Sequence, residues 1–160
     1  MTAPAAGLRR VKDLMTPSPA CCVPGTPIGE VAILFTRHDC GAIPVVEDRD
    51  SGRPVGIVTD RDVACRAVAA GLNPLELRAL DCMTAPCVTI GEDMSLEDCL
   101  ALMEGNRVRR IVVVNDSGAV CGIVAQADLA LRGADGQVAD VVRTVSQPTL
   151  AASQVEPVVD

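Results

Sequence analysis

The stretch GIVTDRD, from Gly56 to Asp62, returns near the other end of the chain as GIVAQAD, from Gly122 to Asp128. The two stretches are 66 residues apart. Upstream of them, Met15 in VKDLMT and Met83 in ALDCMT are 68 residues apart, and the intervening loops account for the difference. Self-similarity at a nearly constant spacing indicates a repeated structural unit. We therefore predict one unit that is present twice.

Each unit has the same predicted order of elements: a short leading helix, a strand, a helix, a hairpin of two strands and a second helix. Thr26-Pro27 predicts one helix start, with Thr26 as N-cap, and Ser95 with Asp98 predicts its counterpart. The apolar residues that follow recur at helical spacing, namely Ile28, Val31, Ala32 and Phe35, then Leu96, Cys99, Leu100 and Met103.

The predicted strands are β-branched runs bounded by turn residues. The first strands are expected at 20–23 and 87–90, and the hairpins pair AIPVV with PVGIV and RIVVV with AVCGIV. Second helices are expected at 61–70 and 127–132. The fold class is therefore α/β, of the α+β kind.

These signals also divide the chain into segments. We predict an N-terminal arm at 1–10, a first unit at 11–71, a linker at 72–78 and a second unit at 79–133. A stripe of valines predicts a C-terminal helix at 134–146, and the remaining 147–160 read as a flexible tail.

Composition narrows the range of partners. The 160 residues carry a formal charge of −7, with 14 basic and 21 acidic side chains, no Trp or Tyr and a single Phe. This balance disfavours binding to a nucleic-acid duplex, and the lack of aromatic residues disfavours base stacking. Because the chain shows neither a membrane-spanning apolar run nor a signal-peptide core, we expect a cytoplasmic protein without a membrane partner.

The eight cysteines do not have the spacing of a metal site. They are Cys21, Cys22, Cys40, Cys65, Cys82, Cys87, Cys99 and Cys121, and no pair has C-x-x-C spacing. With His38 as the single histidine, no metal site is expected. Most of these cysteines lie among alanine and valine, where cysteine behaves as a small apolar residue.

Two β-α-β-β-α units that each end in Gly-hydrophobic-hydrophobic-x-x-x-Asp resemble the paired CBS domain (cystathionine-β-synthase type), or Bateman module. The resemblance covers about Val11 to Gly133 and rests on DLMT, GAIPVVED…GIVTDRD, CMT and RRIVVVNDSGAVCGIVAQAD. The compact size and TDRD followed by AAGLNP are similar to stand-alone bacterial CBS-pair proteins of stress or hypoxic responses.

This resemblance implies a tandem CBS pair with pseudo-twofold symmetry, and a homodimer assembled through helix faces. It also implies clefts between the two units that bind an adenine nucleotide such as AMP, ADP, ATP or S-adenosylmethionine. In the family, the closing aspartate accepts hydrogen bonds from the ribose diol, and here these positions are Asp62 and Asp128. The hydroxyl three residues earlier contacts phosphate, and it is present in Thr59 but absent at Ala125.

The two clefts are therefore expected to differ. A lost hydrogen bond to a charged group corresponds to about a tenfold to hundredfold loss of affinity, so we expect the Ala125 cleft to bind phosphate more weakly. An alternative without a ligand remains for both positions: Thr59 with Asp62 would cap a helix N-terminus, and Asp128 would be an acidic residue favoured there by the helix dipole.

The resemblance also indicates which residues hold adenine and phosphate. By motif position, adenine would contact Cys22, Val23, Ala42, Ile43 and Pro44 in the first unit, and Cys87, Val88, Arg110, Ile111 and Val112 in the second. Either Arg109 or Arg110 could reach a phosphate, or both could be solvated charges at a sheet edge.

The sequence offers three candidate functions. The first is a non-enzymatic sensor that binds an adenine nucleotide and signals to an unknown protein target. The second is a ligand-free stress or redox protein acting through its dimer surface or through Cys40, Cys21 or Cys22. An enzyme is disfavoured, because no phosphate-binding loop, metal cluster or nucleophile with a positioned base is present in the sequence. No catalytic cofactor is expected.

Overall fold

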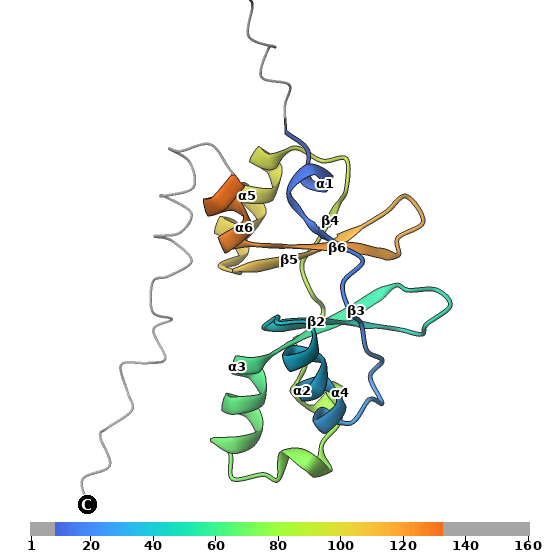
Figure 1. Cartoon of the computed structure of the whole chain (residues 1–160), viewed down its shortest axis with the longest axis vertical. Coiled ribbons are helices and arrows are strands. Elements are labelled where there is room, and N and C mark those ends of the chain that lie inside the picture. Colours follow the sequence, from blue (N-terminus) through green and yellow to red (C-terminus); the bar gives the residue numbers. More distant parts are fainter. Residues whose placement is uncertain (1–8, 133–160) are drawn as a thin grey trace, which may run out of the picture.

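Two β-hairpins form the centre of the molecule (Figure 1). The computed structural model describes residues 9–132, and the predicted C-terminal helix and tail, with most of the arm, lie outside these residues. One hairpin pairs β2 (Ala42–Val46) with β3 (Pro54–Thr59), and the other pairs β5 (Arg110–Val114) with β6 (Val120–Ala125). Helices cover the outer side of each hairpin, so that the two sheets face each other.

The predicted repeat is confirmed down to its backbone irregularities. A bulge after Val45 in the first hairpin has its counterpart after Val113 in the second. Left-handed residues end the helices before each hairpin at Asp39 (φ 46°) and Arg107 (φ 52°). Because such conformations are uncommon for non-glycine residues, their recurrence at one spacing shows that both units share one backbone path.

The sheets differ only at their edges. The second unit has a four-stranded sheet in the order β1-β6-β5-β4, with β1 at Thr16–Pro17 and β4 at Thr89–Gly91. In the first unit the equivalent pairings are single bridges, Cys22 with Val45 and Ile57 with Thr84. The strand predicted at 20–23 is thus reduced to one bridge, whereas β4 overlaps the strand predicted at 87–90.

The two units exchange their leading segments, which we define as residues 10–17 and 78–84. The first of these contains α1 (Val11–Leu14) and β1, and Val11 and Leu14 pack in the core of the second unit with Met103 and Ile111. The second contains α4 (Ala79–Cys82), whose buried residues pack in the core of the first unit. Figure 1 shows α1 beside α5 and α6, and α4 beside α2. Each unit is therefore complete only with a segment from the other repeat.

The exchange explains the glycine that opens each copy of the repeated stretch. A Cβ atom at Gly122 would collide with the side chain of Met15, and one at Gly56 would lie 2.8 Å from the Met83 sulfur. In both cases the methionine belongs to the leading segment of the other repeat. The glycine is needed because the methionine packs directly on the strand backbone.

Two helices carry the predicted apolar faces, with one correction in the first. In α5 (Leu96–Asn106), Leu96, Cys99, Leu100 and Met103 are buried as expected, and Ser95 and Asp98 form the predicted capping box. In α2 (Ile28–Arg37), Ile28 and Val31 are buried but Ala32 is exposed. Leu34 packs against the core instead, because the helix is rotated so that its 28, 31, 34 and 35 positions face inward.

The start of α2 also differs from the prediction. Pro27 occupies the N-cap position, and the Thr26 hydroxyl accepts a hydrogen bond from the Val23 amide, at 3.1 Å, rather than capping the helix. This bond closes the turn that leads into the helix.

The remaining helices follow the hairpins. They are α3 (Asp60–Val63), continued by a π-helical turn at Ala64–Val68, and α6 (Gln126–Arg132). A 3-10 turn at Pro74–Glu76 lies within the predicted linker. In residues 9–132, no helix combines the length and apolarity that crossing a membrane requires.

Candidate functional site

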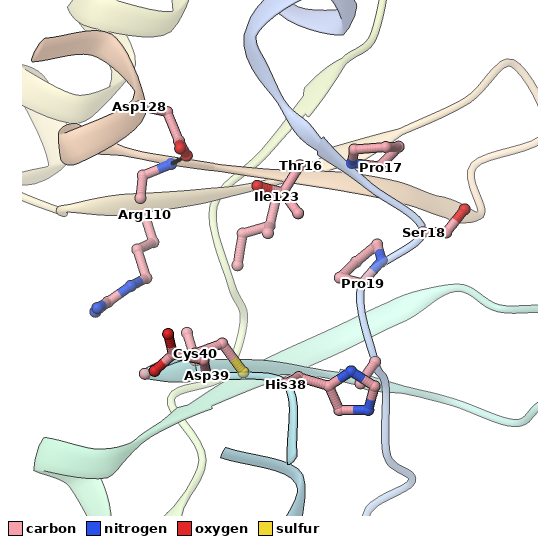
Figure 2. A pocket seen from close by; sticks show the side chains of 14 residues that line it. Thr16, Pro17, Ser18, Pro19, His38, Asp39, Cys40, Arg110, Ile123 and Asp128 are labelled. Atoms are coloured by element: carbon pink, nitrogen blue, oxygen red, sulfur yellow. Dashed lines mark hydrogen bonds between the residues drawn. The ribbon is translucent and has the colours of Figure 1, made fainter. Parts of the chain in front are cut away.

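A pocket of about 440 Å³ lies between the two units, and its walls come from both (Figure 2). Three parts of the chain surround it: the segment after the first leading helix, the turn between α2 and β2, and one end of the β5–β6 hairpin with the start of α6. The lining residues are Thr16, Pro17, Ser18, Pro19, Ala20, His38, Asp39, Cys40, Gly41, Ala42, Arg110, Ile123, Ala125 and Asp128. A cleft of this size with a few polar groups is typical of small-molecule sites.

Asp128 is the carboxylate at one side of the pocket. It lies in the first turn of α6, and one of its oxygens, Oδ2, accepts a hydrogen bond from the Ala125 amide at 2.8 Å. Within the described part of the chain, no other hydrogen bond reaches this carboxylate. Since a carboxylate can accept about four hydrogen bonds, Asp128 has acceptor capacity left for a ligand.

Asp62, its counterpart, is more heavily engaged. Its Oδ2 accepts hydrogen bonds from the amide and the hydroxyl of Thr59, at 2.9 and 2.8 Å, and the Asp62 amide donates back to that hydroxyl. Its other oxygen lies 3.7 Å from the Arg66 guanidinium, and the side chain is only 17% exposed. Thr59 and Asp62 thus form a capping box for α3, and neither lines the pocket.

Three of the residues that the motif assigns to the ligand line the pocket. They are Asp128, Ala42 and Arg110. Ile43 and Ile111 are fully buried in the two cores instead. The physical reason is that successive residues of a strand point to opposite faces, so neighbours such as Ala42 and Ile43 cannot both face the pocket.

The backbone of Cys22 is also engaged within the fold. Its amide donates to the Pro44 carbonyl and its carbonyl accepts from the Val46 amide. Cys22 and Pro44 are buried, Val23 is half-buried, and Arg109 is exposed without lining the pocket.

Sequence reasoning missed the pocket walls formed by Thr16 to Ala20 and by His38 to Gly41. The first wall faces the second unit because β1 pairs with β6, with Thr16 opposite Ile123. The repeated MT dipeptide marks both leading segments, but nothing in the local sequence says which unit each one joins. Predicting this wall would have required knowing that the leading segments are exchanged between the two units.

Burial makes most of the cysteines poor thiolates. Loss of solvent raises the pKa of Cys22 and of Cys99 to about 11. It also raises the pKa of Cys21, Cys82, Cys87 and Cys121 above the ordinary value. Because the thiolate is the reactive form, burial lowers the reactivity of the vicinal pair Cys21 and Cys22 at neutral pH. Among residues 9–132, no three His, Cys, Asp or Glu side chains lie together as metal ligands would.

The family is decided by a comparison with protein-family models. The model of the CBS domain matches residues 11–67 and again 78–135. The chain belongs to the CBS domain family. The two matched copies correspond to the two sequence repeats, whose leading segments are exchanged between the units of the fold.

Relatives of the CBS pair are similar over most of its length. The CBS domain-containing protein YhcV of Bacillus subtilis is 40% identical over 121 residues, which cover 76% of this chain and 83% of YhcV. Hypoxic response protein 1 of Mycobacterium tuberculosis is 30% identical over 142 residues, which cover 89% of this chain and 97% of that protein.

Solved structures of other CBS proteins share the fold. A crystal structure of Hypoxic Response Protein I with two coordinated zinc ions is 30% identical, with a TM-score of 0.68 over 78% of this chain and 98% of that one. PAE2072 from Pyrobaculum aerophilum, complexed with AMP, is 26% identical, with a TM-score of 0.70 over 84% and 99% of the two chains. The CBS pair of MJ0100, in complex with 5′-methylthioadenosine and S-adenosyl-L-methionine, is 28% identical, with a TM-score of 0.68 over 78% and 95%.

Proposed function

We propose that this CBS pair is a regulatory module that binds an adenine nucleoside or nucleotide between its two units, without catalysing a reaction. The ligand would belong to the class of AMP, ADP, ATP or S-adenosylmethionine, and neighbours solved with AMP or with S-adenosylmethionine support this class. The observation that carries the proposal is the pocket between the units, in which the Asp128 carboxylate keeps unused acceptor capacity.

The chemistry of the pocket suits a nucleoside. Two carboxylate oxygens of Asp128 can accept from the two adjacent hydroxyls of a ribose. Pro17, Pro19 and Ile123 supply an apolar wall for a flat base (Figure 2). Compared with Asp62, whose carboxylate is held by Thr59, Asp128 is the better candidate for the ribose contact.

Regulation would follow from the position of the pocket. Because its walls belong to both units, a bound nucleoside favours those arrangements of the two units that keep the walls together. A ligand changes the conformation only through such differential binding.

Isothermal titration calorimetry with adenosine, AMP, ADP, ATP and S-adenosylmethionine tests this function. We expect binding in the micromolar range or tighter, and we expect Asp128→Asn to weaken it about tenfold to a hundredfold through the lost charged acceptor. Asp116→Asn, in the exposed β5–β6 turn, is the matched control and should leave the affinity unchanged.

Two results would count against the proposal. Absence of heat with every compound would refute nucleoside binding, and an unchanged affinity of Asp128→Asn would refute the site. The stoichiometry tests whether the predicted cleft at Thr59 and Asp62 binds a ligand as well. Binding there would raise the stoichiometry to two ligands per chain, and Asp62→Asn should return it to one.

We also propose that the chain assembles as a homodimer through its helices. Apolar side chains are exposed on α2 and on the segment that follows α3, with Ile33 55% and Leu75 76% accessible. Leu75 lies against α2 near Gly29, so these side chains belong to one region of the surface. Exposed apolar groups that gather in this way are typical of protein contacts.

A further inference from the structure

We propose that the turns of the two hairpins form a latch that holds the two units together around the pocket, so that closure of the latch and ligand binding favour each other. The latch is the hydrogen bond from the Val120 amide to the Gly52 carbonyl oxygen, at 2.9 Å. This inference rests on the proposed function, since it concerns the regulation of the same pocket. It places the control of affinity in two residues that do not line the pocket.

The latch joins the two hairpins directly. Gly52 lies in the β2–β3 turn of the first unit, and Val120 is the first residue of β6 in the second. A Cβ atom added at Gly52 would lie 3.4 Å from the Ala119 Cβ atom, so the backbones of the two turns lie close together. Both turns extend to the same side of the molecule (Figure 1). Since Gly52 and Val120 are half-buried, water competes less for this bond than it would at the open surface.

Each turn is held in shape by its own side chains. The Asp48 carboxylate accepts hydrogen bonds from the amide of Ser51, at 2.7 Å, and from that of Asp50, at 2.9 Å. In the second turn, the side-chain oxygen of Asn115 accepts a hydrogen bond from the Ala119 amide at 3.1 Å. Such bonds fix the backbone within each turn, so closing the latch orders little additional chain.

The latch lies beside a wall of the pocket. β1, which lines the pocket, pairs with β6. The next residue of this wall, Ser18, donates its amide to the Cys121 carbonyl oxygen at 3.0 Å. Val120 directly precedes Cys121, so Gly52 meets β6 next to Ser18. A movement of the first unit's turn away from β6 would therefore separate the two units beside this wall.

The sequence allows the latch in one direction only. The residue of the first unit that is equivalent to Val120 is Pro54, since each lies two residues before the glycine of the repeated stretch. Proline has no amide proton, so the first unit cannot donate the equivalent bond to the turn of the second. Pro54 also shows that this place in the hairpin accepts proline, because it pairs with Val46 as Val120 pairs with Val114.

The strength of one hydrogen bond sets the size of the expected effect. A ligand that contacts both units binds only those molecules in which the pocket walls are together, so its apparent affinity scales with the fraction of closed molecules. Loss of the latch should lower the affinity by about twofold to tenfold. Because coupling between two sites is reciprocal, the ligand should stabilise the latch by the same factor.

Val120→Pro tests the latch, because it removes the amide proton at a place that accepts proline. Calorimetry should show the affinities for adenosine and for AMP both reduced by about twofold to tenfold, with their ratio unchanged, since no ligand contact is altered. Val120→Ala is the matched control, which retains the amide and should bind both compounds as the wild type does. Thermal unfolding verifies that each variant is folded.

Amide hydrogen exchange in the wild type tests the reciprocal effect without a variant. Saturation with adenosine or AMP should slow exchange of the Val120 amide by about twofold to tenfold. The Asn115 amide, which is bonded within its own turn to the Ala119 carbonyl oxygen at 2.9 Å, is the control and should change less.

The outcomes separate this inference from the function on which it rests. If both compounds bind the wild type and Val120→Pro with equal affinity, the latch does not control the pocket although the nucleoside site stands. Equal losses in Val120→Pro and Val120→Ala would assign the effect to the valine side chain and overturn the latch. Unchanged exchange of the Val120 amide at saturation would contradict the coupling. If neither compound binds the wild type, the proposed function fails and this inference with it.

Discussion

At Gly56 the strand backbone of one unit touches the leading segment of the other. A Cβ atom there would lie 2.9 Å from the Thr84 carbonyl oxygen, which accepts a hydrogen bond from the Ile57 amide at 3.0 Å. Because this oxygen is backbone, it cannot move aside as a side-chain end can. We expect Gly56→Ala to lower the free energy of unfolding by about 1–3 kcal/mol in urea titrations.

Gly105 provides the matched control for this substitution. It lies in α5, and an added Cβ atom would meet nothing within 4 Å. Gly105→Ala should stabilise the protein by about 0.5–1 kcal/mol, because alanine loses less backbone entropy in a helix. Equal effects of the two substitutions would show that the contact with Thr84 does not restrict residue 56.

The buried cysteines predict how stability changes with pH. Burial raises the pKa of Cys22 and Cys99 in the folded chain to about 11, from an ordinary value of 9.0. Between these values the unfolded chain releases the thiol protons more readily than the folded chain does. The contribution of these two thiols to the free energy of unfolding is therefore fully present below about pH 9. The free energy of unfolding should decrease as the pH rises from about 9 to about 11.

Urea titrations in the presence of a reductant at several pH values measure this decrease. Replacing both residues, as in Cys22→Ala with Cys99→Ala, should make the profile flatter even though it lowers stability at neutral pH. A wild-type profile that is level across this range would contradict the effect of burial on these two thiols.

At the scale of elements, Arg66 connects the helix after β3 to the exchanged segment. Its guanidinium donates hydrogen bonds to the carbonyls of Cys82 and Met83 and to the Thr84 hydroxyl. The side chain is 44% exposed, so we expect Arg66→Gln to lower the free energy of unfolding by only about 1 kcal/mol. Hydrogen exchange at the Thr84 amide should accelerate by more than exchange within β2.

Arg61→Gln serves as the control, because Arg61 lies in the same helix and its side chain has no hydrogen bond or ion pair within residues 9–132. It should leave both stability and exchange unchanged. Uniform acceleration in all strands after Arg66→Gln would mean that the arginine supports the whole fold and not the leading segment in particular.

The elements show which parts of this fold the sequence predicts and why. Both hairpins and the Ser95 capping box were predictable because β-branched runs, turn residues and capping are local signals. The edge strand expected at 20–23 was not predictable. The extent of such a strand depends on how many of its residues lie close enough to the neighbouring strand to pair with it, and here only one bridge forms. The exposed Ala32 similarly reflects a rotation of α2 that only tertiary packing determines.

The residues of the candidate site likewise divide into those that the motif predicts and those that depend on tertiary packing. Asp128, Arg110 and Ala42 could be predicted from the motif because they lie at fixed positions in the repeated unit. Ile43 and Ile111 were grouped with them by position, although alternation places their side chains in the cores. The walls from the first leading segment could not be predicted, because the repeats are similar enough that either pairing would bury the same types of residue.

At the scale of the whole molecule, the exposed apolar residues predict the assembly. We expect the wild type to be a dimer in light scattering coupled to size-exclusion chromatography. Ile33→Glu combined with Leu75→Glu should produce monomers, because burying unpaired charges would oppose association. Met94→Glu, at a 46% exposed site in the second unit, is the control and should remain dimeric. A monomeric wild type, or a dimer that survives the double substitution, would contradict this surface.

The exchange of leading segments has a consequence for how such a chain could have arisen. A polypeptide with only one of the two repeats would lack the segment that completes its own core. Two copies of that shorter polypeptide could supply each other, Met15 of one lying on Gly122 of its twin in the manner seen within this chain. Gene duplication followed by fusion would then join two ancestral partners without altering a contact. Once they were joined, each half would be free to diverge, and the two repeats now differ, with Thr59 in one and Ala125 at the equivalent position of the other.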